Sequence, residues 1–383
     1  MAYAKPENQI AVSTLLLNLL ISVVFYFASA GSAPAQDAQR NSSGESWSAT
    51  TENSVINATP SRTTESHAKS GNRSVDKQRV EVLGPNGRFQ PDSETEKETV
   101  RVDATTTRTV LRTYTWDGNG QRKLAQVTEE EARSTASGDA QTVRTTLNSD
   151  VNGSLRVVQR ETADTRKTSP DVQETKTTVY LADGNGGFTT SRQTQELQKR
   201  SADHRLEEKK TTLLPDGNGN WKVGEVNEKT IREDGKNRTT EERVSRPDLD
   251  GRLSESSRTV GEEAETTAGE KSNTIDTYST VVPGLAGDDR LHLTQRVTTV
   301  QKKNADGETT AQQVEESNPG NPNDGRQVRA KTKYIVRYGA SGTQQTRTIQ
   351  VRDSNGNLNV VSVDTRKSDQ APAAAQIPSD KPQ

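Results

Sequence analysis

Apolar residues recur at fixed positions around a short turn motif, and polar residues occupy the positions between them. Counted from the last glycine of each motif, the sixth residue before it is apolar in the middle of the chain, at Tyr114, Leu147, Tyr180 and Leu213. The second residue after it is mostly apolar: Phe89, Arg122, Leu155, Phe188, Trp221, Leu253, Leu291, Gln327 and Leu358. The third residue after it is polar in Gln90, Lys123, Arg156, Thr189 and Lys222. This period of two predicts strands with a thin apolar stripe on one face.

The turn motif is clearest as Asp-Gly-Asn-Gly at 183–186. Its last glycine recurs every 33 residues, and looser copies follow; the glycines are Gly87, Gly120, Gly153, Gly186, Gly219, Gly251, Gly325 and Gly356. An aspartate that opens a turn can accept backbone hydrogen bonds, and glycine adopts the left-handed conformation without steric cost. The motif is typical of a type I turn followed by a glycine bulge. A weaker turn signal lies halfway between successive motifs, so each 33-residue repeat is predicted to contain two strands.

The fold class that follows is all-β. We expect an extended up-and-down antiparallel meander of ~33-residue β-hairpin repeats over residues 78–366. In each hairpin, the residue two after the glycine should pair with the residue four before it. This register places Trp116 opposite Arg122, where the two side chains could form a cation–π pair. Because open sheets rarely exceed about ten strands, we expect this one to fold over, coil or self-associate.

The remaining segments have different compositions. Residues 1–35 contain an apolar run followed by small-residue sites, which predicts a signal peptide, with an uncleaved membrane anchor as the alternative. Residues 36–77 are rich in serine and threonine and predict a disordered linker, and residues 367–383 predict a disordered tail. The expected location is therefore secreted, periplasmic or in the cell envelope. Membrane contact is expected only if the N-terminal segment is uncleaved.

Composition limits the classes of function. Only 28% of residues are hydrophobic, and the mean hydropathy is −0.95. The net charge of −2 comes from 51 basic and 53 acidic residues, well mixed, so no nucleic-acid partner is predicted. The chain has no cysteine, which excludes disulfides and suits an exported bacterial protein. A transmembrane β-barrel needs an apolar residue at every second position. Segments such as 231–245 do not supply this, and the sequence therefore argues against one.

Calcium binding is the most specific function that the turns suggest, because many calcium-binding loops begin with alternating carboxylate and amide oxygens before a glycine. The candidate ligands are Asp117, Asn119, Asp183, Asn185, Asp216 and Asn218. Turns use the same residue types for conformational reasons alone, and no unit has the complete ligand set of a helix-loop-helix site. We therefore predict no obligatory cofactor, with weak calcium binding possible at the turns.

Five aromatic residues are candidates for stacking on a glycan or peptide: Tyr114, Trp116, Tyr180, Phe188 and Trp221. The alternative is that they form a cross-strand apolar stripe. The three histidines are scattered, at His67, His204 and His292, and no catalytic residue is predicted.

These observations predict a non-enzymatic exported structural or surface-interaction protein, similar to an adhesin or spacer. The alternative is a glycan- or peptide-binding module that uses the aromatic stripe. Self-association or a cell-surface or matrix partner is expected. This function is inferred from the class of protein alone, because the sequence shows no site from which a function could be argued.

Overall fold

A computed structural model describes residues 45–55, 59–117, 119–248, 250–266, 269–280, 290–317, 325–339 and 342–368. The predicted signal peptide (1–35) lies outside these residues, as does all of the predicted tail (367–383) beyond Ser368. The chain separates into two units, 1–43 and 44–383, and all the described residues belong to the second.

The described residues form twenty strands. They are β1 (Glu45–Val55), β2 (Ser61–Ser70), β3 (Arg73–Leu83), β4 (Phe89–Arg101), β5 (Thr106–Trp116), β6 (Arg122–Ser134), β7 (Ala140–Ser149), β8 (Leu155–Ser169), β9 (Val172–Ala182), β10 (Phe188–Arg200), β11 (Arg205–Pro215), β12 (Trp221–Asp234), β13 (Asn237–Pro247), β14 (Leu253–Glu265), β15 (Lys271–Ser279), β16 (His292–Asn304), β17 (Gly307–Ser317), β18 (Arg326–Gly339), β19 (Gly342–Arg352) and β20 (Leu358–Ser368).

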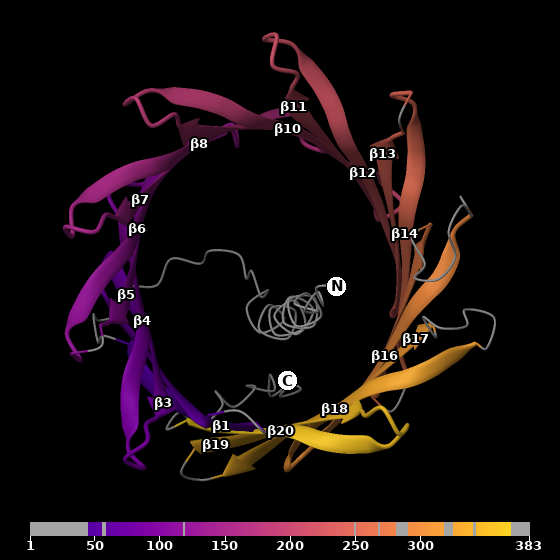
Figure 1. The fold of residues 1–383 in the computed structure, drawn as a ribbon. Helices are drawn as coiled ribbons and strands as arrows, with labels where there is room; N and C mark the ends of the chain where they lie inside the picture. The colour runs from indigo at the N-terminus through magenta and orange to yellow at the C-terminus, as the bar shows by residue number, and fades with distance from the viewer. Residues whose placement is uncertain are drawn as a thin grey trace, which may run out of the picture. The chain divides into compact units, whose positions relative to one another are not determined.

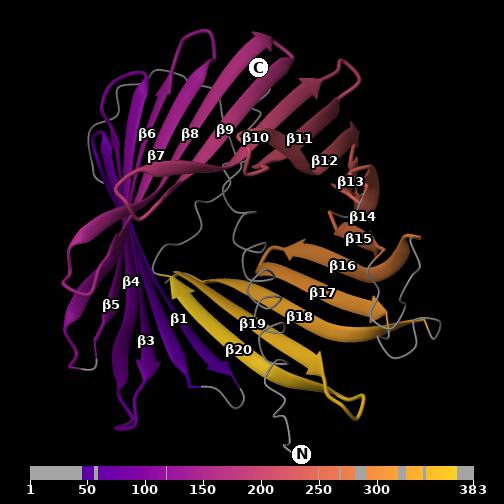
Figure 2. The ribbon, with the colours of Figure 1, turned by 45° about the horizontal axis from the view of Figure 1, so that its top comes forward.

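The strands form one antiparallel sheet in which each strand pairs with the next along the chain. Figure 2 shows neighbouring strands running in opposite directions. The predicted fold class, an all-β up-and-down antiparallel meander, is confirmed. The sheet also closes, because β1 pairs with β20 from Ala49–Ser368 to Val55–Ser362. Figure 1 shows β1 beside β20, where the first and last strands meet.

The turn chemistry and the register agree with the sequence. In the hairpin between β5 and β6, the Gly120 amide donates to the Asp117 carbonyl at 2.9 Å, and Trp116 pairs with Arg122. The residue two after the glycine also pairs with the residue four before it at Gly153, Gly186, Gly219 and Gly251. These four glycines have φ between 78° and 89°. Because this φ is left-handed, a Cβ at these positions would strain the backbone.

The strands begin earlier than the sequence indicated. The array was predicted to start at residue 78, but β1, β2 and the first half of β3 lie within 36–77, the predicted disordered linker. That part of the prediction is wrong. These strands are short of apolar residues and carry no Asp-Gly-Asn-Gly motif, yet their backbones pair in register over nine residues between β1 and β2.

A β-bulge follows each of the Asp-Gly-Asn-Gly-type turns, in the second strand of the hairpin. One residue is left out of the register each time; the nine are Asp92, Ala125, Val158, Ser191, Gly224, Ser256, Thr294, Arg329 and Val361. The hydroxyls of Ser256 and Thr294 donate to carbonyls of the preceding strand at 3.0 and 3.1 Å. Bulges bend a strand and increase its twist, which favours curvature of the sheet.

Burial is shallow throughout the described residues. Six apolar side chains are buried: Val127, Val179, Val226, Ile231, Val314 and Val336. No large side chain is less than 2% exposed. A sheet without a compact apolar core depends on its backbone ladders and on cross-strand side-chain pairs.

The sheet has two faces. We call the face that bears Tyr114, Trp116, Tyr180, Phe188 and Trp221 the aromatic face, since the pairings place all five on one side. We call the opposite face the threonine face. Thr142, Ala163, Thr177, Thr194 and Thr212 lie on it in one row across β7–β11.

Candidate functional site

The five predicted aromatic residues share a face but do not form one platform. Tyr114 and Trp116 lie on β5, Tyr180 and Phe188 on β9 and β10, and Trp221 on β12. Strands in a sheet are about 4.8 Å apart, so β5 and β12 are about 34 Å apart along the sheet. A single small ligand therefore could not contact all five side chains.

Arginine side chains lie over three of the five aromatic rings. The Arg122 guanidinium lies 3.5 Å from the centre of the Tyr114 ring, and Arg160 lies 4.4 Å from Phe188. Trp116 is opposite Arg122 in register, as predicted, but the arginine over its ring is Arg79, at 5.6 Å. The predicted Trp116–Arg122 contact is therefore replaced by two others. Arg122 reaches the diagonal neighbour because it also forms an ion pair with Glu94, which is opposite Tyr114 on β4.

The candidate calcium ligands Asp117, Asp183 and Asp216 hold their own turns together. The Oδ1 atom of Asp117 accepts hydrogen bonds from the backbone amides of Asn119 and Gln121, both at 2.9 Å. Asp183 and Asp216 accept from the amides two and four residues later in the same way, at 2.8 to 3.0 Å.

These hydrogen bonds favour the ionised form of the carboxylates. The backbone amide of Gln121 lowers the pKa of Asp117. The backbone amide of Asn218 lowers the pKa of Asp216. Asn119, Asn185 and Asn218 contribute their backbone amides to the turns. The described residues contain no group of three His, Asp or Glu side chains placed to hold a metal ion. Calcium binding at the turns stays a prediction.

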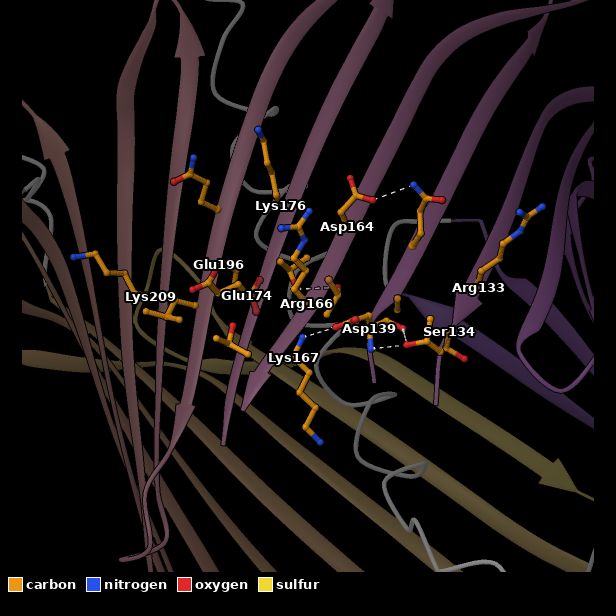
Figure 3. A pocket seen from close by; sticks show the side chains of 18 of the residues that line it. Arg133, Ser134, Asp139, Asp164, Arg166, Lys167, Glu174, Lys176, Glu196 and Lys209 are labelled. Carbon is orange, nitrogen blue, oxygen red and sulfur yellow. Dashed lines mark hydrogen bonds between the residues drawn. The ribbon is translucent and has the colours of Figure 1, made fainter. Parts of the chain in front are cut away.

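A hollow of about 1490 Å³ lies across β6–β11 and is lined by charged and polar side chains (Figure 3). Arg166, Lys176 and Lys209 contribute positive charge, and Asp164 and Glu174 contribute negative charge. No histidine lines the hollow. The mixed charges favour a hydrated surface and do not select an anion or a cation.

Hydrogen bonds within the hollow use some of its polar groups. The Asp164 carboxylate accepts from the Gln141 amide at 3.0 Å, and the Asp139 carboxylate accepts from the Lys167 backbone amide at 2.8 Å. These residues could not be singled out from the sequence, because charged residues at these positions resemble those along the rest of the array.

The histidines remain apart. His67 lies on β2, where its Nδ1 atom is 2.5 Å from Asp76 Oδ1 on β3. His204 lies in the turn between β10 and β11 with a left-handed φ of 58°. His292 begins β16. The geometry therefore brings no two histidines to one site.

Comparison with known proteins gives a coarse likeness only. No protein-family model matches the chain, and no curated protein matches it. The chain is similar in fold to the siderophore receptor PirA from Pseudomonas aeruginosa, with 8% identity and a TM-score of 0.46, over 86% of this chain and 81% of the receptor. It is also similar to the copper transporter OprC, with 6% identity and a TM-score of 0.42, over 87% of this chain and 81% of the transporter. A BenF-like porin from Pseudomonas fluorescens Pf-5 has 11% identity and a TM-score of 0.38, over 85% of this chain and 97% of the porin.

These three structures correct the functional expectation. They are a receptor, a transporter and a porin, and none of the three is an adhesin or a spacer. The prediction of a structural or surface-interaction repeat protein is wrong, and its alternative of a glycan- or peptide-binding module is not retained. The physical reason for the error is closure, since the sequence predicts a long sheet that folds over, coils or self-associates but not that its first and last strands pair. The described part of the chain contains no helix that is long and apolar enough to cross a membrane.

Proposed function

We propose that the chain is a non-catalytic, water-lined ring that holds hydrophilic solutes or lets them pass through its interior. The observation that carries the proposal is the closure of twenty strands through the pairing of β1 with β20. A closed sheet grows wider with each strand, and about eight strands already leave an interior just wide enough for side chains to fill. Closed sheets of about 16 or more strands enclose a channel or a plugged lumen. Twenty strands therefore enclose a space that side chains cannot fill.

The character of the enclosed space follows from two neighbouring rows of residues. On the threonine face, the row across β7–β11 is Thr142, Ala163, Thr177, Thr194 and Thr212. On the aromatic face, the row one residue away is Gln141, Asp164, Lys176, Gln195 and Thr211. Both rows are polar or small, so the interior along β7–β11 is hydrophilic whichever face lines it. Water rather than a packed apolar core is expected there.

The absence of catalysis is part of the proposal. The hollow across β6–β11 is lined by lysine, arginine, carboxylates and threonine without a histidine to serve as a base. No metal-binding group of three acidic or histidine side chains occurs in the residues that the structure describes. We propose that the ring acts through its shape and polarity and needs no cofactor.

The proposed location is the cell envelope of a bacterium. The apolar segment within residues 1–35 supports export, and the cysteine-free composition suits a protein that leaves the cytoplasm without disulfides. The balanced charge supports a role that does not involve nucleic acid.

The test uses the natural lack of cysteine. Thr211 and Thr212 are adjacent on β11 and point to opposite faces, and each pairs with polar or small residues in the two rows described above. Single variants Thr211→Cys and Thr212→Cys are labelled with biotin maleimide, a small water-soluble reagent. Streptavidin, which is too bulky to enter the ring, is then added, and binding is measured by a gel shift.

We expect both cysteines to react with the small reagent and only one of the two biotinylated variants to bind streptavidin. Binding of streptavidin to both variants would show that both faces are open to bulk solvent and would contradict the ring. Failure of either cysteine to react with the small reagent would show that the interior is filled, and would contradict a water-lined space.

A further inference from the structure

The seam between β1 and β20 differs from every other strand pairing in the described sheet. The other pairs join strands that follow one another along the chain, whereas the seam joins the first strand to the last. The seam has seven residue pairs. By comparison, β1 and β2 share nine pairs, and β19 and β20 share ten.

Side chains reinforce the seam from one strand further away. Arg366 of β20 forms an ion pair with Glu65 of β2, with 2.7 Å between Nη2 and Oε2. The two side chains are 22% and 21% exposed, so the pair is partly shielded from water. Because β1 lies between these strands, the ion pair spans it. The edge formed by β20 therefore recognises β1 by its backbone and β2 by charge.

Closing the seam within one chain has an entropic cost that the hairpins do not have. Residues 51 and 366 pair directly, although almost the whole array separates them. In the unfolded, flexible chain, the entropic cost of bringing two segments together rises slowly with the length between them. Each hairpin closes over a short turn, so the seam is the contact that competes least well with a contact between molecules.

A second copy of the chain offers the same partner. Its β1 and β2 carry the same backbone register and the same Glu65, so the β20 edge of one copy can pair with them without losing any contact of the seam. Exchange of an identical element between copies is a low-cost route to oligomers. Edges that are left unpaired are also templates for pairing with another chain.

We propose that the β1 and β20 edges form an exchangeable interface between copies of this chain. At low chain concentration the sheet closes on itself, and at high concentration two copies exchange their edges reciprocally. This inference rests on the closed ring of the proposed function. It adds a second copy as the partner and identifies the surface that binds it.

The test places a disulfide across the seam. Ala49 and Ser368 are register partners, and the double variant Ala49→Cys/Ser368→Cys is prepared with two different affinity tags. Opposed residues of antiparallel strands lie about 4.5–5.5 Å apart, which suits a disulfide. The two tagged forms are mixed, unfolded, refolded over a range of concentrations and oxidised, and the crosslinked chains are separated on a non-reducing gel. The matched control is Ser134→Cys/Ala140→Cys, in the hairpin between β6 and β7.

We expect the seam disulfide to be intramolecular in dilute solution. The fraction of chains linked to the other tag should rise about tenfold for a tenfold rise in concentration while it remains minor, because intermolecular pairing competes with a unimolecular closure. The control disulfide should stay intramolecular throughout. A seam disulfide that is intramolecular at every concentration would overturn the exchange and leave the ring intact. A seam disulfide that forms in neither way, while the control forms, would overturn both the exchange and the ring.

Discussion

The ion pair between Arg347 and Asp364 gives a quantitative test of how the last two strands are held together. Arg347 Nε lies 2.5 Å from Asp364 Oδ2, and Ser362 donates to Oδ1 of the same carboxylate at 3.4 Å. The side chains of Arg347 and Asp364 are 18% and 7% exposed. The change that we consider is Arg347→Leu, which retains apolar volume and removes the charge.

The expected loss of stability is large because the substitution removes the arginine partner of a carboxylate that is only 7% exposed. Removing one partner of a buried pair typically costs about 3–5 kcal/mol of unfolding free energy. Removing the carboxylate as well relieves this penalty, so Arg347→Leu/Asp364→Leu should be more stable than Arg347→Leu alone. An exposed pair provides the control. Lys209 and Glu228 lie 2.8 Å apart on β11 and β12 with side chains 54% and 53% exposed, and such pairs contribute about 0.2–1 kcal/mol.

The assay is urea unfolding followed by circular dichroism, with amide hydrogen exchange in β19 and β20 as a local measure. We expect Arg347→Leu to accelerate exchange in these two strands and to lower the unfolding midpoint clearly more than Lys209→Leu does. Equal effects of the two variants would refute the reasoning, since burial would then not determine the strength of the pair. So would a double variant that is less stable than Arg347→Leu.

Three further predictions concern single positions. Gly186 has a φ of 89° with open space where a Cβ would lie. Gly186→Ala should therefore lower the unfolding free energy, measured by urea unfolding, by about 1–2 kcal/mol through backbone strain alone. Gly186→Asn should lower it less, and equal losses for the two variants would contradict backbone strain as the cause. Backbone hydrogen bonding from Thr105 lowers the pKa of Asp103 from 3.8 to about 2, so its contribution to stability is complete above pH 3.8 and is lost as the pH falls through 2. The stability difference between the native chain and Asp103→Asn should disappear over that interval, and a difference independent of pH would contradict the assignment. Trp221 is 38% exposed, whereas Trp116 lies under Arg79. In variants that retain one tryptophan, acrylamide should therefore quench the fluorescence of Trp221 more than that of Trp116. Equal quenching would argue against this packing.

The hairpins could be predicted from the sequence because their cause is local. Asp183 accepts hydrogen bonds within its own turn, and Gly186 adopts a conformation that few other residues tolerate. These interactions involve neighbours along the chain, so the residue types suffice to predict them. The pairing of Phe188 with Ala182 follows directly from the turn.

The bulges and the first two strands were missed for different reasons. The nine bulged residues share no residue type, from Asp92 to Val361, so composition does not mark them. What they share is spacing, since most of them, such as Ala125 and Ser191, lie five residues after the last glycine of the turn motif. By contrast, the hairpin between β2 and β3 has a signal that could have been used. Gly71 and Asn72 separate the two strands, and a glycine followed by asparagine between paired segments is typical of a tight hairpin.

The candidate site was predicted only in part, because its contacts cross several strands. The sequence places Trp116 opposite Arg122, and the register agrees. The arginine nearest the Trp116 ring comes instead from β3, two strands away. Contacts of this kind depend on ion pairs such as Arg122–Glu94, which compete for the same guanidinium. Closure of the sheet is more distant still, and the β1 sequence has no feature that selects β20.

Closure of the sheet is tested most directly by the distance between its first and last strands. Spin labels are attached at Thr50→Cys and Lys367→Cys, which are register partners in the seam, and the labelled chain is refolded in dilute solution with an excess of unlabelled chain. In a closed sheet the two backbones are about 5 Å apart, so the labels should strongly broaden each other's continuous-wave spectrum within one molecule. In an open sheet, nineteen strand spacings would separate the labels by up to about 90 Å, and this broadening should be absent. Strong broadening supports the ring, and an unbroadened spectrum contradicts it.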